Sequence, residues 1–206
     1  MTYATILADP NWSYRNMSAT AHGAAASIYK CSSTEDICQI PVGKKFSKDD
    51  CTLFLWATLP QLEEAFKVGT SWGFTYVTSV PWFKTVPSTR TLATGVGFWF
   101  QGNAELLMVW RKGSPKRKKT APHVVGYTYD SDEGRAFYAP RKRHSQKPLL
   151  VYDYIEQTVE GPYLELYARR PRKNWTSWGN ELGFILGPQG VAECPLPEKP
   201  KEGFCL

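Results

Sequence analysis

The chain has 206 residues and a formal net charge of +6, with five cysteines and only three histidines. This length is that of one domain with a sizeable hydrophobic core, and no apolar stretch is long enough to span a membrane. The odd number of cysteines and the absence of a C-x-x-C pair favour neither disulfides nor a zinc site, so we expect no metal and a cytoplasmic location.

The first predicted strand covers residues 5–8 and ends in the sequence Asp-Pro-Asn-Trp at 9–12. Such a short and mostly apolar run is typical of a buried strand. Small residues over 16–26 then predict a loop. A helix should begin behind Ser33, which has two acids in the following turn, and a second buried strand is predicted over 52–56.

Helix and strand patterns continue to alternate in the middle of the chain. Thr58 precedes an early proline, has a capping-box spacing, and opens a helix that should end near Gly73. Two more strands are predicted over 74–83 and 105–110, with a glycine-containing loop between them. This order of elements favours an α/β sandwich with a mainly parallel sheet.

The last predicted helix and strand place a second polar residue, in addition to Asp9, just after the end of a strand. A helix with one apolar face should begin at Pro148, and a strand over 163–167, expected to be the last, runs into Arg169. In sheets of this class, ligands bind at the carboxyl ends of the strands. Asp9 and Arg169 both lie just past strand ends, so both could reach one crevice. Residues 1–186 form the predicted domain, and the proline-rich tail 187–206 should be extended or disordered.

Positive charge is concentrated between Arg111 and Lys147. This segment holds eleven lysines or arginines and three acids, a balance of +8 that leaves −2 for the rest of the chain. A solvated charge run is the usual explanation for such a cluster. Aromatic residues interleave with the charges, however, which favours a flap over a nucleic-acid groove, with Arg141 and Lys142 as candidate substrate contacts.

The residues behind the first strand suit the methylation of an exocyclic amino group. The amino nitrogen of adenine is a poor nucleophile because its lone pair is delocalised into the ring. The Asp9 carboxylate and the Pro10 carbonyl can each accept one of its N–H bonds and stabilise the positive charge that develops on nitrogen. Trp12 can stack on an extruded base. The alternative is a plain strand end with an Asp-Pro turn and a core tryptophan.

Seven sequence blocks, in order, resemble the adenine-N6 methyltransferase family named after the seventy-kilodalton subunit of mRNA adenosine methyltransferase (MT-A type). The similarity is greatest to its short prokaryotic and phage-like members and covers roughly residues 3–182. The blocks are 9–12, 53–58, 82–85, 95–100 with 105–107, 144–148, 165–171 and 178–181.

The resemblance implies a Rossmann-like, S-adenosylmethionine-dependent methyltransferase sandwich with permuted motif order, in which the catalytic strand precedes the cofactor-binding half. By the same resemblance, Lys147 would contact the cofactor's carboxylate or help to close the site. Arg169 would hydrogen-bond the cofactor's ribose, and Asn180 with Glu181 would hold its adenine. Asp9 would lie between the cofactor and the target base.

Two more positions follow from the matching blocks, and one position departs from them. Tyr29 matches a family tyrosine near the base pocket, and Lys84 is a candidate substrate contact. Asn11 replaces the second proline of the family motif, which removes the stiffness of a Pro-Pro pair but leaves the Pro10 carbonyl in place. A local side-chain hydrogen bond from Asn11 could restore that stiffness. We therefore expect activity to persist, if at a reduced rate.

The predicted function is direct methyl transfer from S-adenosylmethionine to the N6 amino group of adenine in DNA or RNA, on a single strand or a flipped base. Two alternatives stay open. One is a weak or inactive methyltransferase-like subunit that binds nucleic acid or an active partner, and the other is a basic nucleic-acid-binding protein whose Asp-Pro turn is incidental. The family implies a monomer, a homodimer or a complex with a methyltransferase-like partner.

Overall fold

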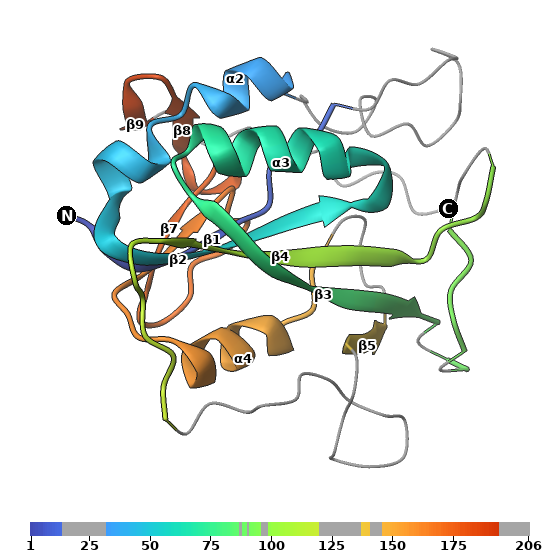
Figure 1. Ribbon diagram of the computed structural model, residues 1–206. Helices are drawn as coiled ribbons and strands as arrows, with labels where there is room; N and C mark the ends of the chain where they lie inside the picture. The colour runs from blue at the N-terminus through green and yellow to red at the C-terminus, as the bar shows by residue number, and fades with distance from the viewer. Residues whose placement is uncertain are drawn as a thin grey trace.

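A seven-stranded sheet forms the centre of the protein, with its strands in the order β5-β3-β4-β2-β1-β6-β7 (Figure 1). The computed structural model describes residues 1–13, 32–86, 88–89, 91–95, 99–119, 137–140 and 146–193. The strands are β1 (Tyr3–Ala8), β2 (Ser47–Thr58), β3 (Thr75–Thr85), β4 (Ala104–Lys112), β5 (Phe137–Pro140), β6 (Tyr163–Leu166) and β7 (Trp175–Trp178).

The strand β1 lies inside the sheet and runs parallel to both of its neighbours, β2 and β6. The pairs β6–β7 and β3–β5 are also parallel, whereas β4 is antiparallel to both β2 and β3. The sheet is therefore mostly parallel, and the predicted α/β, Rossmann-like fold class is confirmed.

Helices cover both faces of the sheet, as Figure 1 shows. The helices α2 (Thr34–Cys38) and α3 (Leu62–Ser71) lie on one face, and α4 (Leu150–Thr158) lies on the other. Short turns complete the chain: a π-helical turn at Val42–Phe46 and 3₁₀ turns at Leu59–Gln61 and Asn180–Leu182. None of the helices in the described ranges is long and apolar enough to cross a membrane.

The continuous apolar runs in the sequence arise because the sheet is buried on both faces. Successive residues of β2 alternate between two cores: Leu53 and Leu55 pack beneath α2 and α3, and Phe54 and Trp56 pack on the side of α4. A strand buried on both faces needs no alternation of apolar and polar residues. The apolar strand predicted at 52–56 is thus the central part of a longer strand.

Local sequence signals explain the ends of the first helices. The Ser33 side chain accepts a hydrogen bond from the backbone N–H of Asp36, as a predicted N-cap should. The helix predicted from Thr58 begins instead with a 3₁₀ turn before α3. It ends beside Gly73, whose φ of 84° is the left-handed conformation that glycine adopts most easily.

Two features at the end of the chain differ from the predictions. The strand at 163–167 is not the last, because β7 follows it and extends the sheet. A hairpin of β8 (Phe184–Gly187) and β9 (Gly190–Glu193) then crosses the predicted boundary between residues 186 and 187. Leu186 and Val191 pack against the core, so residues 187–193 are folded onto the domain. The rest of the predicted tail, 194–206, lies outside the described residues.

Candidate active site

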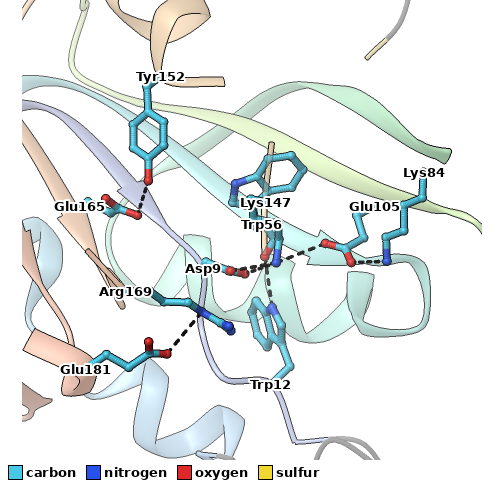
Figure 2. A network of polar contacts seen from close by, with 10 residues as sticks. All are labelled: Asp9, Trp12, Trp56, Lys84, Glu105, Lys147, Tyr152, Glu165, Arg169 and Glu181. Carbon is cyan, nitrogen blue, oxygen red and sulfur yellow. Dashed lines mark hydrogen bonds and ion pairs between the residues drawn. The ribbon is translucent and has the colours of Figure 1, made fainter. Parts of the chain in front are cut away.

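Asp9 directly follows β1 at the carboxyl-terminal edge of the sheet (Figure 2). Its backbone N–H donates to the carbonyl of Leu166 on the neighbouring strand β6, at 3.5 Å. The carboxyl ends of β2, β1 and β6 point the same way because the three strands are parallel. Asp9 therefore occupies the position where sheets of this class bind ligands.

The Asp9 carboxylate is the first member of a chain of four alternating charges (Figure 2). The ammonium group of Lys147 lies 2.7 Å from one of its oxygens and 2.8 Å from the other. The same nitrogen is 3.3 Å from Glu105, whose second oxygen lies 2.6 Å from the Nζ of Lys84. The side chains of Lys147 and Glu105 are only 16% and 7% exposed, so their charges are both buried and paired.

Burial and ion pairing shift the pKa values of these groups in different directions. Burial raises the pKa of Asp9, which Lys147 opposes and Glu105 reinforces. Burial would also raise the pKa of Glu105, but Lys147 and Lys84 outweigh it and hold this pKa below its usual range. Burial would lower the pKa of Lys147, yet its two carboxylate partners raise it. The pKa shifts therefore favour the cationic form of Lys147 and the ionised form of Glu105, whereas they favour the ionised form of Asp9 less than in a free aspartate.

Backbone hydrogen bonds hold the turn behind Asp9. The N–H of Trp12 donates to the carbonyl of Pro10 at 2.9 Å, and the carbonyl of Asn11 accepts from the N–H of Ser32 at 3.0 Å. The indole Nε1 of Trp12 donates to the Trp56 carbonyl at 3.1 Å. These bonds constrain the turn without a second proline.

Trp12 is only 6% exposed and belongs to the core cluster beneath α2 and α3. Its described contacts anchor the turn to β2. The stacking of Trp12 on a target base stays a prediction.

The predicted cofactor-binding residues meet behind β6 and β7. Arg169 follows β6, and its Nε lies 3.7 Å from the carboxylate of Glu181. Asn180 and Glu181 are exposed and begin the 3₁₀ turn behind β7. The approach of the two loops depends on Gly179, because a Cβ there would lie 2.2 Å from the carbonyl oxygen of Ala168. The chain thus holds the three predicted residues at the edge that carries Asp9.

A second buried carboxyl group lies beside this edge. Glu165, on β6, is 9% exposed and accepts a hydrogen bond of 2.8 Å from the hydroxyl of Tyr152. Its other oxygen is buried and has no hydrogen-bond partner among the described residues. Burial raises the pKa of Glu165 to about 7, and the nearby charge of Asp9 adds to the effect of burial. Figure 2 shows Glu165 and Asp9 at neighbouring strand ends.

The structure thus brings together Asp9, Lys147 and Lys84, and separately joins Arg169 to Glu181. The remaining predicted substrate contacts, Tyr29, Arg141 and Lys142, lie outside the described residues.

Sequence reasoning did not nominate Glu105 or Glu165. A signal was available for both, because an acid within or at the start of an apolar strand is rarely buried without a partner. Among the described residues, no three histidine, cysteine, aspartate or glutamate side chains form a group that could hold a metal ion.

The fold and this site define a Rossmann-like methyltransferase. The family model described as MT-A70 matches residues 3–181. The chain therefore belongs to the MT-A70 family.

Curated relatives extend this match. The chain is 28% identical over 200 residues to the type II methyltransferase M.MunI of Mycoplasma sp, which covers 87% of this chain and 78% of the relative. It is 31% identical over 151 residues to METTL3 of Homo sapiens, the N(6)-adenosine-methyltransferase catalytic subunit. Human METTL4, named an N(6)-adenine-specific methyltransferase, is 26% identical over 203 residues and 88% of this chain. The METTL3 match covers 70% of this chain, but the chain spans only 24% of METTL3 and 38% of METTL4.

Proposed function

We propose that this enzyme transfers a methyl group from S-adenosylmethionine to the N6 amino nitrogen of an adenine in nucleic acid. The observation that carries the proposal is the buried Asp9 carboxylate, held by Lys147 at the carboxyl end of β1 and followed by the Pro10 carbonyl. Membership of the MT-A70 family supports it, as do relatives whose names specify methylation of adenine or adenosine at N6.

The residues at this edge of the sheet fit S-adenosylmethionine by their chemistry. Arg169 offers N–H donors and Glu181 acceptor oxygens, as the hydroxyl groups of a ribose require, and the Asn180 amide can pair with an adenine edge. Lys147 is a cation that suits a carboxylate. The bound cofactor supplies a methyl group activated by its positively charged sulfur.

Among the described contacts, Asp9 and Pro10 each leave an acceptor position for the target amine. A carboxylate has about four lone-pair positions, and Lys147 lies close to one on each oxygen, which leaves two. The Pro10 carbonyl has two lone pairs, of which the N–H of Trp12 uses one. Each group can therefore accept one of the two amino protons of adenine, which directs the nitrogen lone pair toward the methyl group.

The charge network favours the transition state because its charges are fixed before the reaction. Positive charge develops on the amino nitrogen as the new bond forms, and the ionised Asp9 stabilises it. Lys147, Glu105 and Lys84 keep that carboxylate in one orientation. Asp9 need not act as a strong base, because the methylated ammonium form of adenine is acidic and releases its proton to water. This description makes Asp9 and Pro10 positioning groups for the amine.

The proposed substrate is either a single-stranded or a double-stranded nucleic acid. An adenine in a single strand or a loop is directly accessible, whereas one in a duplex must be flipped out at a cost of a few kcal/mol. Base contacts by Trp12 and Tyr29, polymer contacts by Lys84, Arg141 and Lys142, a homodimer or methyltransferase-like partner, and a cytoplasmic location stay predictions.

Isotope-labelled S-adenosylmethionine tests the reaction directly. The protein is incubated with labelled cofactor and matched single-stranded DNA, duplex DNA or RNA, and the polymer is digested to nucleosides. Label should appear in N6-methyladenine from at least one polymer and disappear in Asp9→Asn. The exposed Glu63→Gln, which also removes one carboxylate, should retain it. Full activity in Asp9→Asn would refute the role of Asp9, and cofactor binding without any labelled nucleoside would favour the inactive-subunit alternative.

A further inference from the structure

A cavity of about 520 Å³ lies on the α4 face of the sheet, and Asp9 is not among the described residues that line it. Residues of β2, β3 and β4, of the C-terminal half of α4 and of the segment behind β4 line it. On β2 its lining residues are Thr52 and Phe54, which lie four and two residues before Trp56, or ~13 and ~7 Å along the strand. The buried rings of Trp56 and Trp82 pack together at 5.9 Å on the same face, closer to the catalytic edge. The cavity is therefore a site of its own.

The lining of this cavity combines an apolar surface with positive charge. Val80 and Val159 are among its buried apolar residues, and Val77, at its opening, is 52% exposed. Arg111 and Arg117 contribute two guanidinium groups, and no aspartate or glutamate lines the cavity in the described part of the chain. An apolar surface with nearby guanidinium groups suits a ligand with an aromatic ring and a phosphate.

The backbone that carries Arg117 is fixed to α4. The N–H of the next residue, Lys118, donates to the Thr158 carbonyl at 2.9 Å, and its ammonium group donates to the Glu156 carbonyl at 2.7 Å. The same ammonium lies 3.4 Å from Glu160. Figure 1 shows the chain behind β4 descending past the end of α4. These bonds fix the backbone beside Arg117, which reduces the freedom that this segment loses on binding.

The charge around the cavity favours a polyanion over a single small anion. From Arg111 to Lys119 the sequence holds six lysines or arginines and no acid. Lys112 donates hydrogen bonds to Gly43 and Ser47, and Lys118 pairs with Glu160. The exposed Lys116 and Lys119 extend the positive potential beyond the two arginines of the cavity itself, and phosphate backbones gain affinity from several cations at once.

We propose that the cavity lined by Arg111 and Arg117 binds a nucleotide of the substrate strand that lies several positions away from the target adenine. The inference rests on the proposed function, because it takes the polymer to be the substrate. Strand β4 connects the two places: Arg111 lies six residues beyond Glu105, ~20 Å along the strand. Stacked nucleotides rise 3.4 Å each, so about six of them span this distance.

Binding of fluorescent single-stranded oligonucleotides, measured without methyl donor, tests the proposal. Each oligonucleotide has one adenine, with either one or about ten nucleotides on each side. The double variant Arg111→Gln/Arg117→Gln should bind the long oligonucleotide about tenfold or more weakly and lower the salt dependence of binding by about two phosphate contacts. Binding of the short oligonucleotide should not change. The control Lys44→Gln/Lys67→Gln removes two charges from exposed positions outside the cavity and should leave both affinities nearly unchanged.

A second variant tests the role of the cavity's open space without changing its charge. Val77→Trp fills the opening at an exposed position and should weaken binding of the long oligonucleotide with little effect on its salt dependence. Thermal unfolding checks that each variant is folded. The proposal is refuted by equal losses in the arginine and lysine variants, by wild-type affinity in Val77→Trp, or by a wild type that binds both lengths equally well. Adenosine 5′-monophosphate that competes at the polymer's own affinity would also refute it, because the occupant would then be a free nucleotide.

The two proposals fail separately. If the arginine variant loses affinity for the long oligonucleotide while no polymer is methylated, the cavity binds a nucleic-acid strand but the methyltransferase proposal fails. If a polymer is methylated while the cavity variants bind as the wild type does, the reverse holds.

Discussion

Replacing Glu165 with glutamine should change how the stability of the protein depends on pH. Burial raises the pKa of this carboxyl group from 4.5 to about 7, with the Tyr152 hydrogen bond opposing the rise and the charge of Asp9 adding to it. The folded state therefore binds the proton more tightly than the unfolded state does. The stability that this proton contributes is fully present below about pH 4.5 and is lost as the pH rises through 7.

The size of the effect follows from the same two values. A tenfold difference in proton affinity is worth 1.36 kcal/mol, so a rise from 4.5 to about 7 corresponds to about 3 kcal/mol. Glutamine has a similar shape, can still accept the Tyr152 hydrogen bond and does not titrate. The wild type should lose about 3 kcal/mol more stability than Glu165→Gln between pH 4.5 and 8.

Urea unfolding at a series of pH values measures this difference. Both proteins retain the other charged groups near the site, so the pH dependence that the two proteins share cancels in the comparison. A free-energy difference between the two proteins that stays constant from pH 4.5 to 8 would refute the buried, proton-binding state of Glu165.

Two further substitutions test how the site is held. Lys147→Met leaves the buried Asp9 carboxylate without its cation and should lower the unfolding free energy by about 3–5 kcal/mol and abolish methyl transfer. The double variant Lys147→Met/Asp9→Asn should recover stability against urea but not activity. If Lys147→Met alone were as stable as the wild type, the ion pair between Asp9 and Lys147 would be contradicted. Gly179→Ala forces the backbone of Ala168 to move, and should lower stability by about 1–3 kcal/mol and weaken cofactor binding measured by calorimetry. Gly187→Ala, which has open space around its Cβ, is the matched control, and equal cofactor affinities in the two alanine variants would count against the role of Gly179.

The elements that could be predicted from sequence are those whose signal is local. The apolar runs at 5–8 and 52–56 are buried strands, and the Ser33 cap begins a helix. The strand β7 escaped prediction because its four residues include Thr176 and Ser177, and its place is set by parallel pairing with β6. The hairpin β8–β9 escaped for a related reason: its proline- and glycine-rich composition resembles a tail, although apolar residues within it reach the core.

In the site, too, some residues could be predicted from the local sequence, whereas others depend on contacts between distant parts of the chain. Asp9 and Arg169 could be located from the strand ends before them. The pairing of Glu105 with Lys147 and Lys84 could not, because it depends on the register of β4, which places Glu105 opposite Thr58 and beside Trp82. Lys147 was expected to contact the cofactor's carboxylate or help to close the site, and the structure shows it paired with the carboxylates of Asp9 and Glu105. Contacts between residues that are far apart in the chain leave no periodic pattern in a single sequence, so they could not be predicted from it.

The hydrogen bond from the Trp12 N–H to the Pro10 carbonyl restrains the turn of the motif without requiring one particular residue at position 11. A second proline would restrict this turn through a ring within one residue, whereas here a bond between two backbone groups restricts it around Asn11. Position 11 therefore need not be a proline for the acceptor carbonyl of Pro10 to keep its place. A motif search that requires two consecutive prolines selects for one chemical means of bending the chain, and it overlooks enzymes that reach the same bend by another.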